Sequence, residues 1–92
     1  MKKSDIKALK AMLESFNPYV SGIEAAIAVI EPLHESEEEQ YDANSDRWQQ
    51  GDKGQAASQR IEHLNNMRME LETARDALDN AINALGELTA AS

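Results

Sequence analysis

The sequence predicts an all-α protein in which a short N-terminal helix accompanies a long antiparallel helical hairpin with coiled-coil-like packing. Two observations predict this three-helix fold. Two long stretches carry residues spaced alternately by three and four, and a short segment containing glycines separates the stretches. We expect one domain, residues 1–92, with helices at about 5–16, 18–49 and 52–88.

The first predicted helix begins at Ser4 or Asp5, because both residue types are good N-caps, and ends near Phe16. A helix of about a dozen residues is marginal in isolation, so its apolar stripe needs burial against another element. The helix can fold back on its own hairpin or cross to the hairpin of another subunit. The stripe consists of Ile6, Leu9, Met12, Leu13 and Phe16.

The second predicted helix starts at Pro18 with Asn17 as its N-cap. Proline disfavours helical geometry in the residue before it but suits the first turn of a helix. Within this helix, Pro32 removes a backbone donor and predicts a bend. The seam, meaning the stripe that faces the neighbouring helix, is Val20, Ile23, Ile27, Ile30, His34, Glu37, Tyr41, Asn44 and Trp48.

The predicted reversal lies around Gly51 and Gly54. Gly51 either ends the second helix in a left-handed conformation or caps the third helix, with Asp52 in its first turn. The seam of the third helix is Ala57, Ile61, Leu64, Arg68, Leu71, Arg75, Leu78, Ile82 and Leu85.

These seams predict an antiparallel register in which Glu37 faces Arg68 and His34 faces Leu71. Two charges inside a seam are costly unless they meet each other. We therefore expect Glu37 and Arg68 to form an ion pair.

Length and composition restrict the architecture. A chain of 92 residues without cysteine cannot rely on disulfides or thiolate metal sites, and its apolar area is thin for an elongated monomer. We expect a homodimer or higher homo-oligomer, with a lone three-helix bundle as the alternative. An alanine face on the third helix permits the close approach of a neighbour. It consists of Ala74, Ala77, Ala81 and Ala84.

The net charge of −8 argues against direct nucleic-acid binding, which requires Lys and Arg to offset phosphates. The charged N-terminus does not resemble a secretory signal, and no run of about 20 apolar residues predicts a membrane span. We expect a cytoplasmic protein of a bacterial host, with no membrane association.

Charge is unevenly distributed along the chain. Four lysines lie within the first ten residues, and an acidic block occupies residues 35–46. Such blocks either steer a partner or form an ordinary solvated helix face. Tyr41 and Trp48 lie on one stripe within the acidic region, as interface anchors or as side chains that fill space at the end of the seam. The candidate partner-binding residues are Glu37, Glu38, Tyr41, Asp42, Asp46 and Trp48.

Catalytic and metal-binding patterns are weak. Glu31 and His34 have the Glu-x-x-His spacing of di-iron bundles, but the second histidine, His63, follows Arg60 instead of a carboxylate. Two ligands make an incomplete metal shell. No nucleophile–base pattern or phosphate-binding loop is present in the sequence. We expect no enzyme activity, no metal and no cofactor.

Residues 41–54, Tyr-Asp-Ala-Asn-Ser-Asp-Arg-Trp-Gln-Gln-Gly-Asp-Lys-Gly, resemble a segment of small helical-hairpin proteins from phages, prophages and other mobile elements. In those proteins an aromatic-Asp start, a Trp-Gln pair and an acidic-Lys-Gly turn precede a long Leu/Ala-rich helix. The resemblance covers roughly residues 35–88, and a serine often occupies the position of Gly51. It implies a mobile-element origin and carries no established activity.

The leading functional hypothesis is a non-catalytic phage or mobile-element protein that binds a host protein and inhibits or modulates it. One alternative is a structural or assembly role, as a scaffold or chaperone component. Another is an acidic mimic of nucleic acid that occupies a basic groove, which predicts partner binding with a steep salt dependence.

Overall fold

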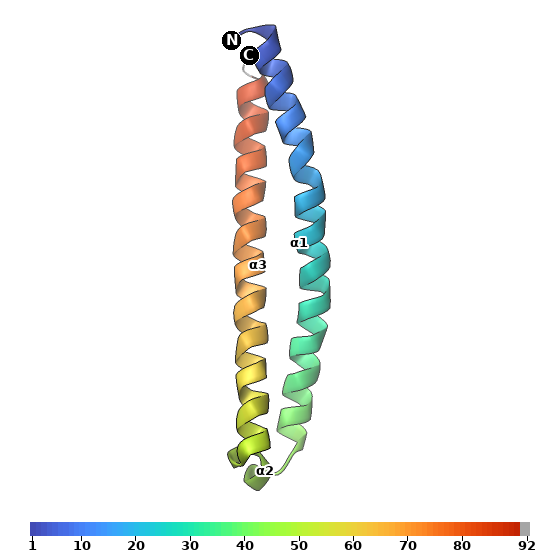
Figure 1. Cartoon of the computed structure of the whole chain (residues 1–92), viewed down its shortest axis with the longest axis vertical. Coiled ribbons are helices and arrows are strands. Elements are labelled where there is room, and N and C mark those ends of the chain that lie inside the picture. The colour runs from blue at the N-terminus through green and yellow to red at the C-terminus, as the bar shows by residue number, and fades with distance from the viewer. Residues whose placement is uncertain (91–92) are drawn as a thin grey trace.

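The computed structural model describes residues 1–90 and contains three helices within them. They are α1 (Lys3–Ala43), α2 (Asp46–Gln50) and α3 (Asp52–Ala90). The long helices α1 and α3 lie side by side in opposite directions, and α2 occupies the reversal between them (Figure 1). The molecule measures 68 × 15 × 15 Å. The predicted all-α fold and antiparallel hairpin are confirmed.

The prediction of a separate N-terminal helix is wrong, because α1 is continuous through Asn17 and Pro18. Its first turn also begins slightly earlier than expected, with Lys2 as an N-cap that makes no side-chain cap bond. The stripe of the first eighteen residues continues in phase into the later seam, since Leu13, Phe16, Val20 and Ile23 keep the alternating spacing of four and three. One uninterrupted stripe favours one helix.

Both prolines of α1 are exposed, and Pro18 also borders a groove that Leu71 and Leu78 of α3 line. Pro18 and Pro32 are fourteen residues apart, which is four turns of a helix, so they share one side of it. Each removes one backbone hydrogen bond, and this loss bends a helix with the proline on its convex side. In Figure 1 α1 is bowed whereas α3 is nearly straight.

The predicted seam residues within α1 and α3 lie along the contact between the two helices, whereas Asn44 and Trp48 lie beyond the end of α1. The register differs from the expected one. Glu37 pairs with Arg60, so its expected pairing with Arg68 is wrong. Leu71 shares a groove with Ile23 and Ala26, not with His34. The two helices are therefore displaced by about two turns relative to the predicted register. The cause is the reversal, which begins at Asn44 instead of beyond Gln49.

The interface between α1 and α3 buries little apolar surface. Among residues 1–90, the buried hydrophobic side chains are Ile27, Ala57 and Leu85. The expectation that a separate first helix covers the open end of the hairpin is not met, because those residues extend α1. Many large apolar side chains consequently remain exposed in the single chain. Within residues 1–90, no helix combines the length and apolar character that a membrane-spanning segment needs.

Candidate functional site

The candidate partner-binding residues lie at the end of the hairpin that contains α2, which we call the tip (residues 37–54). Here α1 ends at Ala43, and Asn44 and Ser45 are extended. The hydroxyl of Ser45 accepts a hydrogen bond from the backbone N–H of Trp48 at 3.3 Å and caps α2. A serine followed by an acidic residue is an N-cap signal. It could have revealed α2, which was not predicted.

Gln49 connects α2 to the end of α1 by hydrogen bonds. Its side-chain Nε2 donates to the backbone carbonyl of Tyr41 at 2.8 Å and to that of Asn44 at 3.2 Å. The Tyr41 carbonyl also accepts from the backbone N–H of Asn44 at 3.2 Å, so Gln49 adds a second bond at the end of α1, where the helix itself supplies few donors. The tip is therefore an ordered structure, not a loose loop.

The two glycines have different roles. Gly51 is extended, with φ of −80° and ψ of 179°, so the left-handed alternative is wrong. Its carbonyl accepts from the N–H of Gln55, and α3 begins at Asp52 as predicted. Gly54 is buried, and a Cβ there would lie within 3.0 Å of backbone atoms of Trp48 and Gln49. Only glycine lets α3 approach α2 so closely.

Tyr41 and Trp48 contact each other edge to face, with ring centroids 6.2 Å apart and an interplanar angle of 64°. Both rings are half-buried. The pair connects the last turn of α1 to α2, and such aromatic pairs contribute about 0.5–1.5 kcal/mol beyond the area they bury. The two aromatic candidates therefore also serve the architecture of the tip.

The four acidic candidates have different surroundings. Glu37 binds Arg60 at 3.2 Å, and Glu38 lies 2.8 Å from Nε2 of His34. Asp42 and Asp46 are exposed and have no cationic partner among residues 1–90. Their carboxylates are available to another molecule, whereas those of Glu37 and Glu38 are already engaged.

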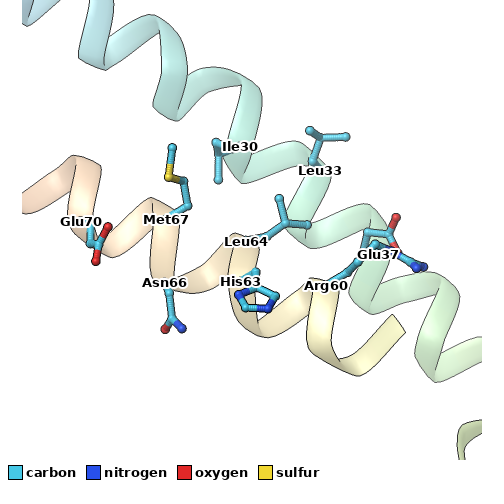
Figure 2. Close-up of a pocket in the computed structure, with 9 residues that line it drawn as sticks. All are labelled: Ile30, Leu33, Glu37, Arg60, His63, Leu64, Asn66, Met67 and Glu70. Atoms are coloured by element: carbon cyan, nitrogen blue, oxygen red, sulfur yellow. The ribbon is translucent and has the colours of Figure 1, made fainter. Parts of the chain in front are cut away.

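A groove runs from the tip along the hairpin, and Glu37 and Arg60 lie at one end of it. Figure 2 shows Ile30 from α1 and Leu64 and Met67 from α3 directed toward the space between the helices, whereas Leu33 points away from α3 at the border of the groove. Among the other side chains that border this groove are His63, Asn66 and Glu70. The groove is mainly apolar away from the ion pair.

This groove belongs to a longer apolar face, of which only the alanines on the last helix were predicted. From residue 12 to 33 of α1 and from residue 67 to 88 of α3, every seventh residue beside the seam is apolar. These residues are Met12, Tyr19, Ala26 and Leu33 on α1, and Met67, Ala74, Ala81 and Leu88 on α3. In an antiparallel pair such positions lie on the same side of both helices. The grooves confirm this placement, since Met12 and Ala81 border one groove, and Leu33 and Met67 another.

The opposite edge of the hairpin is polar. Its α1 positions are Lys10, Asn17, Glu24, Glu31 and Glu38, and its α3 positions include Ser58, Asn65, Glu72 and Asp79. The hairpin is thus amphipathic over residues 12–33 of α1 and 67–88 of α3.

No group of three or more potential metal ligands lies together within residues 1–90. His34 instead contacts the carboxylate of Glu38 one turn later in α1. Comparison with protein-family models, curated proteins and solved structures finds no match for this chain.

Proposed function

We propose that this protein is non-catalytic and acts by binding another protein through its acidic tip. In keeping with the resemblance of residues 41–54 to mobile-element proteins, the proposed partner is a bacterial host protein that the tip modulates. The observation that carries the proposal is the set of exposed, unpaired carboxylates on an ordered tip. They include Glu39, Asp42 and Asp46, none of which has a cationic partner among residues 1–90.

The location of these charges supports a binding role. The C-terminal end of a helix carries partial negative charge, so cations stabilise it and carboxylates do not. The last turn of α1 contains no basic residue and ends with Asp42 next to Ala43. Each unfavourable charge there costs about 0.3–1 kcal/mol. Local features that oppose stability are expected at functional sites, because selection for function retains them.

The chemistry of the tip defines the class of partner. A surface of carboxylates beside the aromatic pair of Tyr41 and Trp48 complements a basic surface with apolar or cationic groups that stack on rings. Such an interface forms quickly at low ionic strength and weakens as salt rises.

Site-specific photocrosslinking in the native host tests the proposal. A photoreactive residue at Gln40 is expected to capture a protein that one at Asn80, far from the tip, does not. The double substitution Asp42→Lys, Asp46→Lys should abolish the crosslink. The matched control Asp76→Lys, Asp79→Lys changes the charge equally on α3 and should retain it. Equal capture by both double variants would contradict the proposal.

A structural or assembly role is the second candidate, and the apolar face favours it. An exposed apolar surface over residues 12–33 of α1 and 67–88 of α3 marks an interaction site. Light scattering distinguishes the two functions, because an open assembly grows with concentration and a closed oligomer does not.

A further inference from the structure

We infer that the apolar face is covered by a second copy of this chain, which forms an antiparallel, two-fold symmetric four-helix bundle with the acidic tips at opposite ends. This inference concerns a surface separate from the tip and does not depend on the identity of any host partner.

A single hairpin buries little apolar surface. Its buried hydrophobic side chains within residues 1–90 are Ile27, Ala57 and Leu85. On the apolar face Tyr19 remains 65% exposed, Leu33 48% and Met67 48%. A two-helix unit usually becomes stable when it associates into a bundle. Association through the apolar face would bury the most exposed apolar surface.

The face reaches the size that a specific dimer interface needs. Its apolar residues run from Met12 to Leu33 on α1 and from Met67 to Leu88 on α3, which is about 32 Å at about 1.5 Å per residue. With the 15 Å width of the molecule, the face covers about 500 Å² per copy, and two copies together would bury about 1,000 Å², the lower limit for a specific interface.

The distribution of charge selects the orientation. Residues 23–71, the half of the hairpin nearer the tip, contain eleven acidic and four basic residues and carry a net charge of −7. The remaining residues contain six acidic and five basic residues and carry −1. Parallel stacking would put the two −7 halves beside each other. Antiparallel stacking separates them and places each beside a nearly neutral half.

The sizes of the side chains are consistent with a two-fold axis across the middle of the face. Gly22 and Ala26 on α1, with Ala74 and Ala77 on α3, lie near the middle of the hairpin and let helix backbones approach closely. A two-fold axis in the plane of the interface then packs α1 on its counterpart and α3 on its counterpart, each pair antiparallel.

The arrangement has a functional consequence. The carboxylates at the tip lie away from the apolar face, so dimerisation leaves them exposed. A dimer would present two equal tips separated by roughly the 68 Å length of the hairpin. Two sites on one rigid bundle raise the effective concentration for partners that are themselves multivalent.

Two measurements on the full chain test the inference. Sedimentation equilibrium should give twice the chain mass of 10.2 kDa. Ala81→Glu on the apolar face should weaken the dimer at least tenfold, whereas Asn83→Glu, two residues away on the opposite side, should leave it unchanged. A constant mass of one chain would overturn the inference and leave the face to another protein. Growth beyond two copies, or equal effects of both substitutions, would also overturn it.

The orientation of the two copies is tested in a chain that keeps Ala81. A failure of the Ala81→Glu variant to fold therefore does not affect this second measurement. The chain has no cysteine, and the exposed Gln50 at the tip can be replaced by a single spin-labelled cysteine. Antiparallel stacking predicts a label-to-label distance on the order of 60–70 Å, set by the length of the hairpin. A distance below about 25 Å would show parallel stacking and contradict the inference.

Discussion

Glu37 on α1 accepts a hydrogen bond from Arg60 on α3, with 3.2 Å between Oε2 and Nη2. This pair joins residues 23 positions apart and defines the register of the hairpin near the tip. Arg60 is 58% exposed and Glu37 27%, so solvent screens the interaction and its contribution is small. The pair nevertheless shows which turns of the two helices are neighbours.

A double-mutant cycle can identify the register. Combining Glu37→Gln with Arg60→Gln should give a coupling free energy of about 0.2–1 kcal/mol in chemical denaturation. The cycle of Glu37→Gln with Arg68→Gln should give a coupling near zero. The opposite result would establish the register in which Glu37 meets Arg68.

The seams illustrate what the sequence can and cannot specify. The spacing of three and four is a local property, so it identified which residues face the partner helix. A displacement by one heptad leaves every seam residue in the seam. The spacing therefore cannot choose the register, which depends on where Ser45 and Gln49 form the reversal.

A local rule also misplaced one helix boundary. Asn17 and Pro18 form a good helix start, and this signal outweighed the unbroken phase from Phe16 to Val20 in the prediction. The apolar face was missed for a related reason. A separate helix at 5–16 removes Met12 from the side of α1 that also carries Tyr19, Ala26 and Leu33.

Pro18→Ala tests the continuity of α1. Proline in the interior of a helix costs about 3 kcal/mol relative to alanine, whereas proline in a first turn costs little. We therefore expect Pro18→Ala to raise the free energy of unfolding by about 1–3 kcal/mol and to increase helical circular dichroism. No change, or a loss of stability, would support a helix that begins at Pro18.

Gly54→Ala tests the packing of the tip. The added methyl group would meet backbone atoms of Trp48 and Gln49, which cannot rotate away, so we expect a loss of about 1–3 kcal/mol. Gly86→Ala is the matched control. Its Cβ would meet nothing within 4 Å, and alanine should add about 0.5–1 kcal/mol of helix stability. Thermal or urea unfolding of the two variants should change in opposite directions.

Arg68→Met tests the polar group in the seam. The guanidinium of Arg68 donates from Nη2 to Asn65 at 2.7 Å, but its buried Nε has no hydrogen-bond partner among residues 1–90. An unsatisfied buried donor costs about 1–3 kcal/mol, and methionine of similar length removes it. We expect the urea midpoint to rise. A clear fall would show that Arg68 has a partner in the assembled protein.

The most direct test of the fold is the distance between Lys7 and Glu35, both exposed on α1. Cysteines at these positions of the cysteine-free chain can carry spin labels, and excess unlabelled protein suppresses signals between chains. A continuous α1 places the two residues about 40 Å apart, from 28 residues at about 1.5 Å each. A separate first helix folded back on the hairpin would place them within about 25 Å, and that result would contradict the two-helix hairpin.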